Sequence, residues 1–380
     1  MTVDLRVDPP ITARPIVLLV SHSAAGGAQE LWMDLALGFA RRGHKVALWA
    51  LYPWAESSCP ARVGLDWTYI VPVRPSGVTG YAKLMHQLVQ RIRREQPAMI
   101  ISALPAANIA AAAAARAARV GTAVVTTHHS PSSTYNRVLD KIDGLTATLA
   151  PVTDVVCVSN AVRASHNDKS PGYRAKLRTI TNALPPKIEA QIERLTKARG
   201  PRLVPRGRTV VAAGRLATQK NYGLLLQAAA LATTVRIEIV GDGPQGPELR
   251  AMATQLGVID HVHFWGQKTR EETLAIVDEA DVFVQVSLFE GHSLALVESA
   301  KLGLPLIVSD VPVQVEGISA RDGSRCGITV PLDDPAALAA AITQLLDRPD
   351  NYARRTAQAR QLGKEASFDQ MVDAYEALLR

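Results

Sequence analysis

Short apolar runs alternate with amphipathic segments along most of the chain. Runs of this length between turn residues are typical of buried strands, and their alternation with helical patterns is typical of a parallel α/β sheet. In the first half of the chain the predicted strands are residues 16–20, 46–50, 69–71, 99–102, 123–126, 155–158 and 177–181. This half is therefore predicted to be one doubly wound α/β domain.

The pattern changes after residue 184. Residues 185–207 are rich in Pro, Gly, Lys and Arg, so we expect a connector between domains, with a short helix near residues 188–198. A second series of strands is predicted at residues 209–213, 235–240, 261–264, 282–286 and 306–308. The predicted organisation is an N-terminal domain (1–184), a linker (185–207), a second domain (208–364) and a C-terminal segment (365–380).

The C-terminal segment has the pattern of an amphipathic helix over residues 367–379. Ser367 is a suitable N-cap, and Met371, Tyr375 and Leu378 fall on one face. The overall expectation is an α/β protein of two Rossmann-like, doubly wound domains facing across a cleft. In such sheets ligands bind beyond the carboxyl ends of the strands.

Composition narrows the class of protein. The 380 residues are 47% hydrophobic and carry a net charge of +7. Three widely spaced cysteines predict neither a disulfide framework nor a zinc site, and no basic and apolar leader is present, which favours a cytoplasmic protein. Nucleic acid is disfavoured because basic and aromatic residues do not interleave along a strand pair.

The basic segment 83–94 has Leu84, Leu88 and Ile92 at helical spacing. We favour an ordinary surface helix that packs these residues inward. The alternative is an apolar face that rests on an anionic membrane surface.

The segment 289–298 carries two carboxylates, Glu290 and Glu298, eight residues apart. Glu290 follows a predicted buried strand, whereas Glu298 falls about one turn into a predicted helix that begins near Leu294. Gly291 supplies a flexible turn and Ser293 an N-cap, so free N–H groups lie between the two carboxylates. A protein that binds a sugar nucleotide needs carboxylates that bind the hydroxyls and backbone amides that bind the phosphates, and this segment offers both.

Two basic residues occupy the loop after the first strand of the second domain. Arg215 and Lys220 follow Gly214, and their cations suit phosphate oxygens. Two solvated loop cations are the alternative, but the glutamates in the same domain favour phosphate. The turn at residues 241–244 is interpreted as structural, allowing a helix to begin near Gly246.

The first domain offers two weaker candidates. Gly26 and Gly27 lie between a strand and a helix, where a ligand can approach the backbone closely, although a tight turn explains them equally well. His128 and His129 follow an apolar strand, and a metal site there would need a third ligand that the local sequence does not supply. No two aspartates are separated by one residue, so the Asp-x-Asp motif that holds a divalent metal in many nucleotide-sugar enzymes is absent.

Taken in order, these motifs resemble the retaining GT-B glycosyltransferases of the family-4 type (glycosyl transferases group 1). The resemblance spans nearly the whole chain, and its most specific part is Glu290-x7-Glu298 followed by Gly303-x-Pro305. It implies a GT-B fold whose C-terminal helix crosses back to the N-terminal domain. It also implies transfer of a hexosyl or N-acetylhexosaminyl group from a nucleoside-diphosphate sugar, with UDP preferred, and no metal or other cofactor.

The resemblance also implies roles for individual residues. Glu290 would contact the donor sugar, Glu298 the ribose, and Arg215 and Lys220 the diphosphate. The amides of residues 291–294 (Gly291, His292, Ser293, Leu294) and Gly27 would help to bind the diphosphate. Gly26 and Gly214 would also belong to the donor-binding site. The family's cleft histidine aligns best with His129 and less well with His128. Ser159 and Asn182 border the cleft in the family, and capping explains them equally well.

His292 stands where the family often has an aromatic residue or Pro, and residues 51–80 match no pattern that we can interpret. The expected acceptor is a sugar or lipid-linked oligosaccharide in bacterial surface polysaccharide or glycolipid synthesis, at the inner face of the membrane. A non-catalytic binding protein and a nucleotide-sugar epimerase of the same fold are the alternatives.

Overall fold

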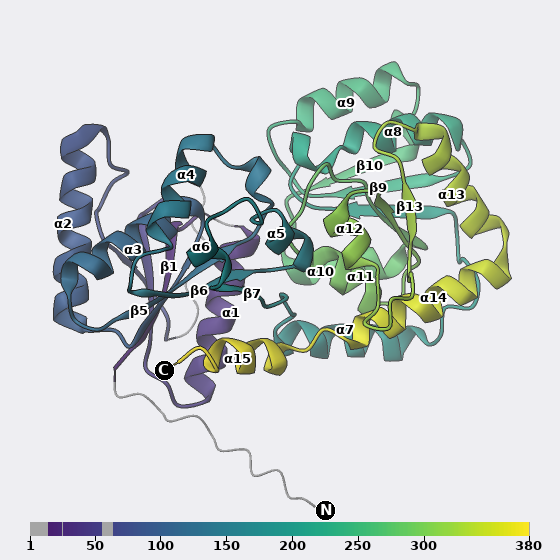
Figure 1. Ribbon diagram of the computed structural model, residues 1–380. Coiled ribbons are helices and arrows are strands. Elements are labelled where there is room, and N and C mark those ends of the chain that lie inside the picture. The colour runs from purple at the N-terminus through teal and green to yellow at the C-terminus, as the bar shows by residue number, and fades with distance from the viewer. Residues whose placement is uncertain (1–13, 25, 55–63, 380) are drawn as a thin grey trace, which may run out of the picture. The chain divides into compact units, whose positions relative to one another are not determined.

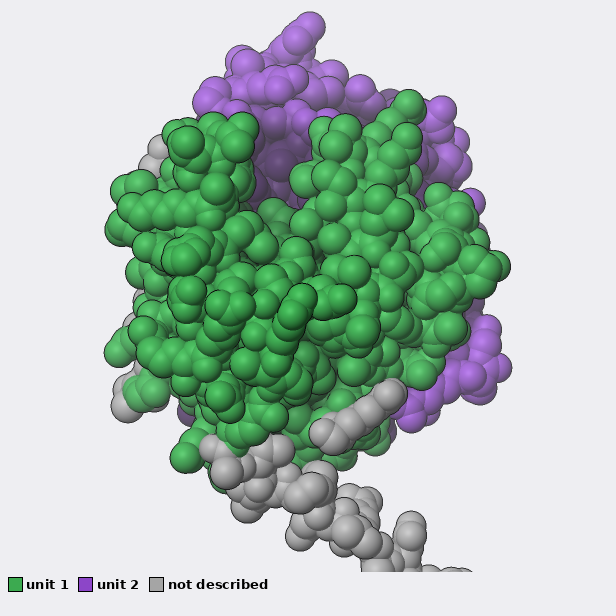
Figure 2. Space-filling view, turned by 60° about the vertical axis from the view of Figure 1, so that its left-hand side comes forward, with its two compact units in different colours: residues 1–181, 369–380 green, residues 182–368 purple. Residues whose placement is uncertain are grey.

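The structure is a computed structural model that describes residues 14–24, 26–54 and 64–379. The chain forms two compact units, which are coloured separately in Figure 2. Unit 1 comprises residues 1–181 and 369–380, and unit 2 comprises residues 182–368. Each unit contains one parallel β-sheet between layers of helices (Figure 1).

Unit 1 has seven strands in the order β3-β2-β1-β4-β5-β6-β7. Because parallel crossovers are right-handed, α1, which links β1 to β2, lies on the opposite face from α3, which links β4 to β5. Its elements are β1 (Ile16–His22), α1 (Gly27–Arg41), β2 (Val46–Tyr52), β3 (Trp67–Tyr69), α2 (Gly77–Glu95), β4 (Met99–Ala103), α3 (Pro105–Ala118), β5 (Ala123–His128), η1 (Ser132–Thr134), α4 (Arg137–Thr146), β6 (Val152–Cys157), α5 (Asn160–Ala164), α6 (Pro171–Arg174), β7 (Leu177–Thr179) and α15 (Phe368–Glu376).

Unit 2 has six strands in the order β10-β9-β8-β11-β12-β13, which is the Rossmann order with its reversal between β8 and β11. Helices α8, α9 and α13 contribute to the core on one face, and α7, α10, α11 and α14 to the core on the other. Its elements are α7 (Pro186–Arg199), β8 (Thr209–Ala213), η2 (Thr218–Lys220), α8 (Tyr222–Leu231), β9 (Arg236–Val240), α9 (Gly246–Gln255), η3 (Ile259–His261), β10 (Val262–Gly266), α10 (Arg270–Glu279), β11 (Val282–Gln285), α11 (Leu294–Lys301), β12 (Leu306–Ser309), α12 (Pro312–Gly317), β13 (Ile328–Val330), α13 (Pro335–Asp347) and α14 (Pro349–Lys364).

Two doubly wound α/β sheets are therefore confirmed, with differences in detail. Strand β3 ends at Tyr69, where the predicted strand begins, and β13 was not predicted. The segment expected to be a linker contains α7, whose Ile188 and Ile192 are buried in the core of unit 2 together with Leu184. Apolar packing therefore makes this segment part of unit 2 rather than a free connector.

Helix α2 packs Leu84, Leu88 and Ile92 into the core of unit 1. The surface-helix interpretation is confirmed, and the alternative that these residues rest on a membrane is wrong because all three are buried. Cys157 and Cys326 are free and buried, whereas Cys59 lies outside the described residues.

Helix α15 belongs to unit 1, although most of unit 2 precedes it in the sequence. Arg42, which caps α1, forms ion pairs with Asp373 at 2.7 Å and Glu376 at 2.5 Å, and His44 contacts Glu376 as well. Met371 and Tyr375 are buried as the helical pattern predicts. Unit 1 is therefore built from two separate stretches of sequence.

Candidate functional site

The loop after β8 brings Lys220 over Gly214. Gly214 has a φ of +145°, and a Cβ atom at this position would lie 2.9 Å from Cε of Lys220. The carbonyl of Gly214 also accepts a hydrogen bond from the hydroxyl of Tyr222 at 3.0 Å. Glycine is required here because a side chain would displace the lysine.

The turn at residues 241–244 supports this loop from beneath. A Cβ atom at Gly241 would lie 2.1 Å from the carbonyl oxygen of Gly214, and one at Gly243 would lie 2.5 Å from that of Leu216. Helix α9 then begins at Gly246, as predicted. The two glycines thus allow two backbone loops to pack in contact, which is the structural role expected for this turn.

Lys220 forms an ion pair with Glu290. Nζ lies 2.7 Å from Oε1, and the two side chains are only 15% and 10% exposed. Lys220 follows β8 and Glu290 follows β11, the two strands between which the strand order reverses. Since this reversal is where parallel sheets open a ligand crevice, the pair occupies the expected binding edge of unit 2. Together with burial, the Glu290 charge raises the pKa of Tyr222 above its ordinary value.

The backbone before Glu290 is held in place by the backbone carbonyl and the side chain of Gln219. Leu288 N–H donates to the carbonyl of Gln219 at 2.8 Å, and the Gln219 amide donates to the carbonyl of Phe289 at 3.0 Å. These bonds join the loop that carries Lys220 to the loop that carries Glu290. The relative position of the ion pair is therefore set by backbone contacts as well as by charge.

Helix α11 begins at Leu294 with Ser293 as its N-cap, as predicted. The Ser293 hydroxyl accepts from Leu296 N–H at 3.3 Å and donates to Oε1 of Gln285 at 2.7 Å. Gln285 is held in turn by Gln314, because the two amide groups are hydrogen bonded at 3.0 Å. The first N–H groups of α11 have no carbonyl partner within the helix, so this end of the helix suits an anion.

Glu298 lies on the second turn of α11 and is paired with Arg270. Nε of Arg270, the first residue of α10, lies 2.6 Å from Oε1 of Glu298. Glu298 is 7% exposed, so a guanidinium fixes the orientation of a largely buried carboxylate. Arg270 was not predicted from the sequence, because the local pattern there is the Thr269–Glu272 capping box, which marks the start of a helix rather than a site.

Asn182 and His292 also meet in unit 2. The Asn182 side chain donates to the carbonyl of His292 at 3.2 Å and thereby supports the turn before α11. Burial lowers the pKa of His292 to about 4, so its imidazole is neutral near pH 7.

Arg215 is exposed in the loop after β8, and within the described residues its side chain makes no hydrogen bond or ion pair.

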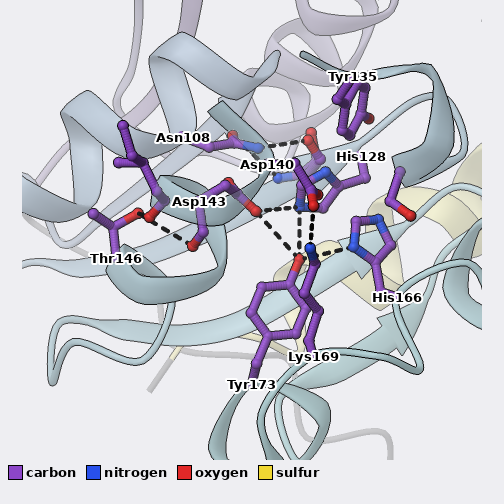
Figure 3. Close-up of polar contacts among 12 residues, drawn as sticks. Asn108, His128, Tyr135, Asp140, Asp143, Thr146, His166, Lys169 and Tyr173 are labelled. Carbon is purple, nitrogen blue, oxygen red and sulfur yellow. Dashed lines mark hydrogen bonds and ion pairs between the residues drawn. The ribbon is translucent and has the colours of Figure 1, made fainter. Parts of the chain in front are cut away.

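The two histidines of unit 1 differ in environment. His128 is the last residue of β5 rather than part of the following loop, and it is buried with Nε2 3.1 Å from the Tyr173 hydroxyl (Figure 3). His129 is partly exposed and packs edge-on against Trp32 with ring centroids 5.1 Å apart. Burial lowers the pKa of both histidines, to about 4 for His129.

The hydrogen bonds of Thr127 identify which ring nitrogen of His129 carries the proton. The Thr127 hydroxyl donates its one hydrogen to the carbonyl of Ser102 at 2.8 Å, so it must accept from Nε2 of His129, which lies at 3.0 Å. Nδ1 of the neutral ring is then an acceptor. His129 can therefore accept a hydrogen bond from a ligand hydroxyl, whereas His128 is already engaged in a buried polar cluster.

The remaining unit 1 candidates, Gly26, Gly27 and Ser159, lie at the N-terminal ends of helices. Gly26 precedes α1, and the space where Gly27 would carry a Cβ atom is open. Ser159 is buried and caps α5 by accepting from Val162 N–H at 3.1 Å. Capping thus accounts for Ser159.

The described part of the chain contains neither a metal-binding cluster of side chains nor a membrane-spanning helix. Within residues 14–24, 26–54 and 64–379, no group of three or more His, Cys, Asp or Glu side chains could hold a metal ion. No helix in these ranges combines the length and apolar character needed to cross a membrane.

Solved structures share this fold. HepE of Anabaena, solved in complex with UDP-glucose, superposes with a TM-score of 0.76 at 18% identity over 96% of this chain and 98% of HepE. Sucrose-phosphate synthase of Thermosynechococcus elongatus gives the same TM-score at 18% identity, over 96% of this chain and 98% of that one. The predicted GT-B fold, with two Rossmann-like units, is confirmed by these likenesses.

Two bacterial glycosyltransferases are similar in sequence to this chain. D-rhamnosyltransferase WbpZ of Pseudomonas aeruginosa is 28% identical over 66% of this chain and 64% of its own length. The lipopolysaccharide core biosynthesis glycosyltransferase LpsE of Rhizobium meliloti is 29% identical over 59% of this chain and 63% of its own length. The match thus spans less than two thirds of either relative.

Two family profiles match consecutive parts of the chain. The profile of Glycosyltransferase Family 4 matches residues 25–188, and that of Glycosyl transferases group 1 matches residues 195–362. Together they cover more than half of the chain and include every residue of the site described above. The chain therefore belongs to the group 1 glycosyltransferases of the family-4 type.

Proposed function

We propose that the protein transfers a hexosyl or N-acetylhexosaminyl group from a nucleoside-diphosphate sugar to an acceptor hydroxyl. The observation that carries this proposal is the ion pair of Lys220 and Glu290 at the strand-order reversal of unit 2. Lys220 and Glu290 lie there, and the segment that follows Glu290 leads into the first N–H groups of α11. This set can bind phosphate oxygens and sugar hydroxyls at one place.

In this proposal Lys220 and Arg215 neutralise the departing diphosphate, helped by the amides of residues 291–294. Glu290 binds hydroxyls of the donor sugar, and Glu298, oriented by Arg270, binds the ribose. His129 accepts a hydrogen bond from a sugar hydroxyl at Nδ1. Preorganised donors of this kind stabilise the charge that develops on the leaving group.

We further propose that transfer retains the configuration at the anomeric carbon and needs no metal ion. The acceptor hydroxyl attacks from the face that the diphosphate leaves, and a phosphate oxygen of the leaving group takes its proton. The positive charge for the diphosphate comes from side chains and helix amides. Full activity in EDTA and an unchanged anomeric configuration by NMR are the expected results, and loss of activity in EDTA would overturn metal independence.

A UDP-sugar is the proposed donor, supported by the UDP-glucose that HepE binds. The proposed acceptor is a sugar or lipid-linked oligosaccharide in surface polysaccharide or glycolipid synthesis at the cytoplasmic membrane face. The name of the relative LpsE, a lipopolysaccharide core biosynthesis glycosyltransferase, supports this class of acceptor.

A thermal-shift screen of UDP-, GDP- and ADP-sugars tests the proposal. A ligand at about 100 times its Kd stabilises the folded state by about 2.7 kcal/mol, which corresponds to a Tm rise on the order of 5 to 10 °C for a unit of this size. We expect this rise with a UDP-sugar and a much smaller one for Lys220→Met. No rise with any sugar nucleotide would refute donor binding.

A further inference from the structure

Helix α4 exposes its apolar residues and buries a carboxyl group. Val138, Leu139, Ile142 and Leu145 are 64%, 38%, 38% and 72% exposed. They recur at helical spacing and therefore share one side of the helix. The only buried residue of α4 is Asp143. A helix at the surface of a water-soluble domain normally presents the opposite arrangement.

The inner side of α4 is occupied by a buried polar cluster (Figure 3). The Tyr173 hydroxyl lies 3.3 Å from Oδ2 of Asp143, 3.1 Å from Nε2 of His128 and 3.2 Å from Nδ1 of His166. Asp140 forms an ion pair with Lys169 one turn earlier on the helix. Both carboxylates of α4 are thus engaged within unit 1, which holds the helix with its apolar side outward.

The outward side of α4 is cationic as well as apolar. Arg137 and Lys141 are exposed, while the acidic residues of the helix are engaged in the cluster. The surface formed by residues 137–139, 141, 142 and 145, here called the α4 face, therefore combines four apolar side chains with two cations. This chemistry matches an anionic bilayer, which offers phosphate groups above an apolar layer.

We propose that the α4 face docks unit 1 on an anionic lipid bilayer. The cations contact lipid phosphates, and the four apolar side chains enter the boundary between headgroups and acyl chains. A second copy of the chain fits less well, because a two-fold interface uses the same surface on both sides. Arg137 and Lys141 would then enter the interface twice, while the carboxylates of α4 are engaged with Lys169 and Tyr173. The net charge of +7 adds a general attraction to the same membrane. The proposal concerns a surface of unit 1 and does not depend on the reaction proposed for the donor site in unit 2.

Co-sedimentation with vesicles tests the proposal. The purified full chain is mixed with vesicles of phosphatidylcholine alone or of phosphatidylcholine and phosphatidylglycerol at about three to one. We expect binding to the anionic vesicles only, and weaker binding at high salt, where surface charges are screened. Replacing both cations (Arg137→Gln with Lys141→Gln) should weaken binding about 30-fold. Replacing the two most exposed apolar residues (Val138→Ser with Leu145→Ser) should weaken it by at least about 10-fold.

Matched controls come from unit 2. Lys197→Gln with Lys364→Gln removes two exposed cations, and Leu203→Ser with Val204→Ser removes two residues that are 63% and 54% exposed. These variants should bind vesicles as the unaltered protein does. All variants should keep the Tm and the sugar-nucleotide thermal shift of the unaltered protein, which separates membrane docking from folding and from donor binding.

Three results would overturn the proposal. Unchanged vesicle binding by both α4 variants would show that the α4 face is not the contact. Equal losses in the controls would show that total charge or apolar surface, rather than α4, causes binding. A dimer in vesicle-free solution that Val138→Ser with Leu145→Ser converts to monomer would assign the face to a second copy.

Discussion

Removing the charge of Lys220 should destabilise unit 2 through Glu290. The two charges lie 2.7 Å apart, and at an effective dielectric constant of about 20 their attraction is about 6 kcal/mol. Desolvation of the two largely buried groups offsets several kcal/mol of this attraction. In Lys220→Met the desolvation of Glu290 remains but its partner does not. We therefore expect the free energy of unfolding to fall by about 3 kcal/mol, the lower limit for breaking a buried pair.

Replacing both residues should restore most of this loss. Lys220→Met with Glu290→Gln leaves no buried charge, so we expect a net cost of about 1 kcal/mol. Glu290→Gln alone should cost about 1 kcal/mol, because the flexible lysine can turn its ammonium toward solvent. The coupling energy of this double-mutant cycle is then about 3 kcal/mol.

Urea unfolding gives the free energies, and hydrogen–deuterium exchange of peptides from β8 and β11 assigns the change to unit 2. Donor KM and kcat measured on the same variants separate stability from function. A cycle that is additive within about 0.5 kcal/mol would refute the reasoning, because it would mean that the two charges do not stabilise each other in solution.

Further predictions concern the donor site and the acid stability of unit 1. Glu298→Ala should raise the donor KM by about 10-fold through loss of a buried polar contact, and unchanged donor kinetics would contradict the ribose role. Arg215→Ala should lower kcat by roughly 100-fold while leaving the Tm unchanged, since its side chain is exposed, and near-normal turnover would remove it from the mechanism. Burial lowers the pKa of His166 from 6.5 to about 4, so the unfolded state binds more protons in this range and stability should fall by up to about 1.4 kcal/mol per pH unit as pH drops from 6.5 to 4. Burial raises the pKa of Asp143 from 3.8 to about 7, which favours the folded state at low pH. Asp143→Asn should therefore make the free energy of unfolding, measured by urea unfolding, fall more steeply as the pH drops. A shallower fall would contradict the raised pKa of Asp143.

The sequence predicted most of the fold because strand and helix periods are local properties. Buried strands such as β1 and β8 were located within a few residues, whereas β13 is only three residues long and lies at a sheet edge, where the apolar signal is weak. Lys220 and Glu290 could be assigned to one edge because each follows a parallel strand. Their pairing follows from the order of the strands, which the sequence does not show.

Two features depended on tertiary structure. Arg270 reaches Glu298 because α10 and α11 pack on the same face of the sheet, and nothing near residue 270 indicates this contact. The separate surroundings of His128 and His129 could not be predicted either, because β5 extends two residues beyond the apolar run and takes His128 into the interior.

The packing of α15 against unit 1 has a consequence for biosynthesis. Residues 1–181 emerge from the ribosome long before Glu376, which is the partner of Arg42 and the buried His44. Unit 2 lies between them in the sequence, so it can fold to completion first even though it is synthesised second. The N-terminal half of the nascent chain must meanwhile leave the surface that α15 covers exposed, which makes this surface the expected binding site for chaperones during translation.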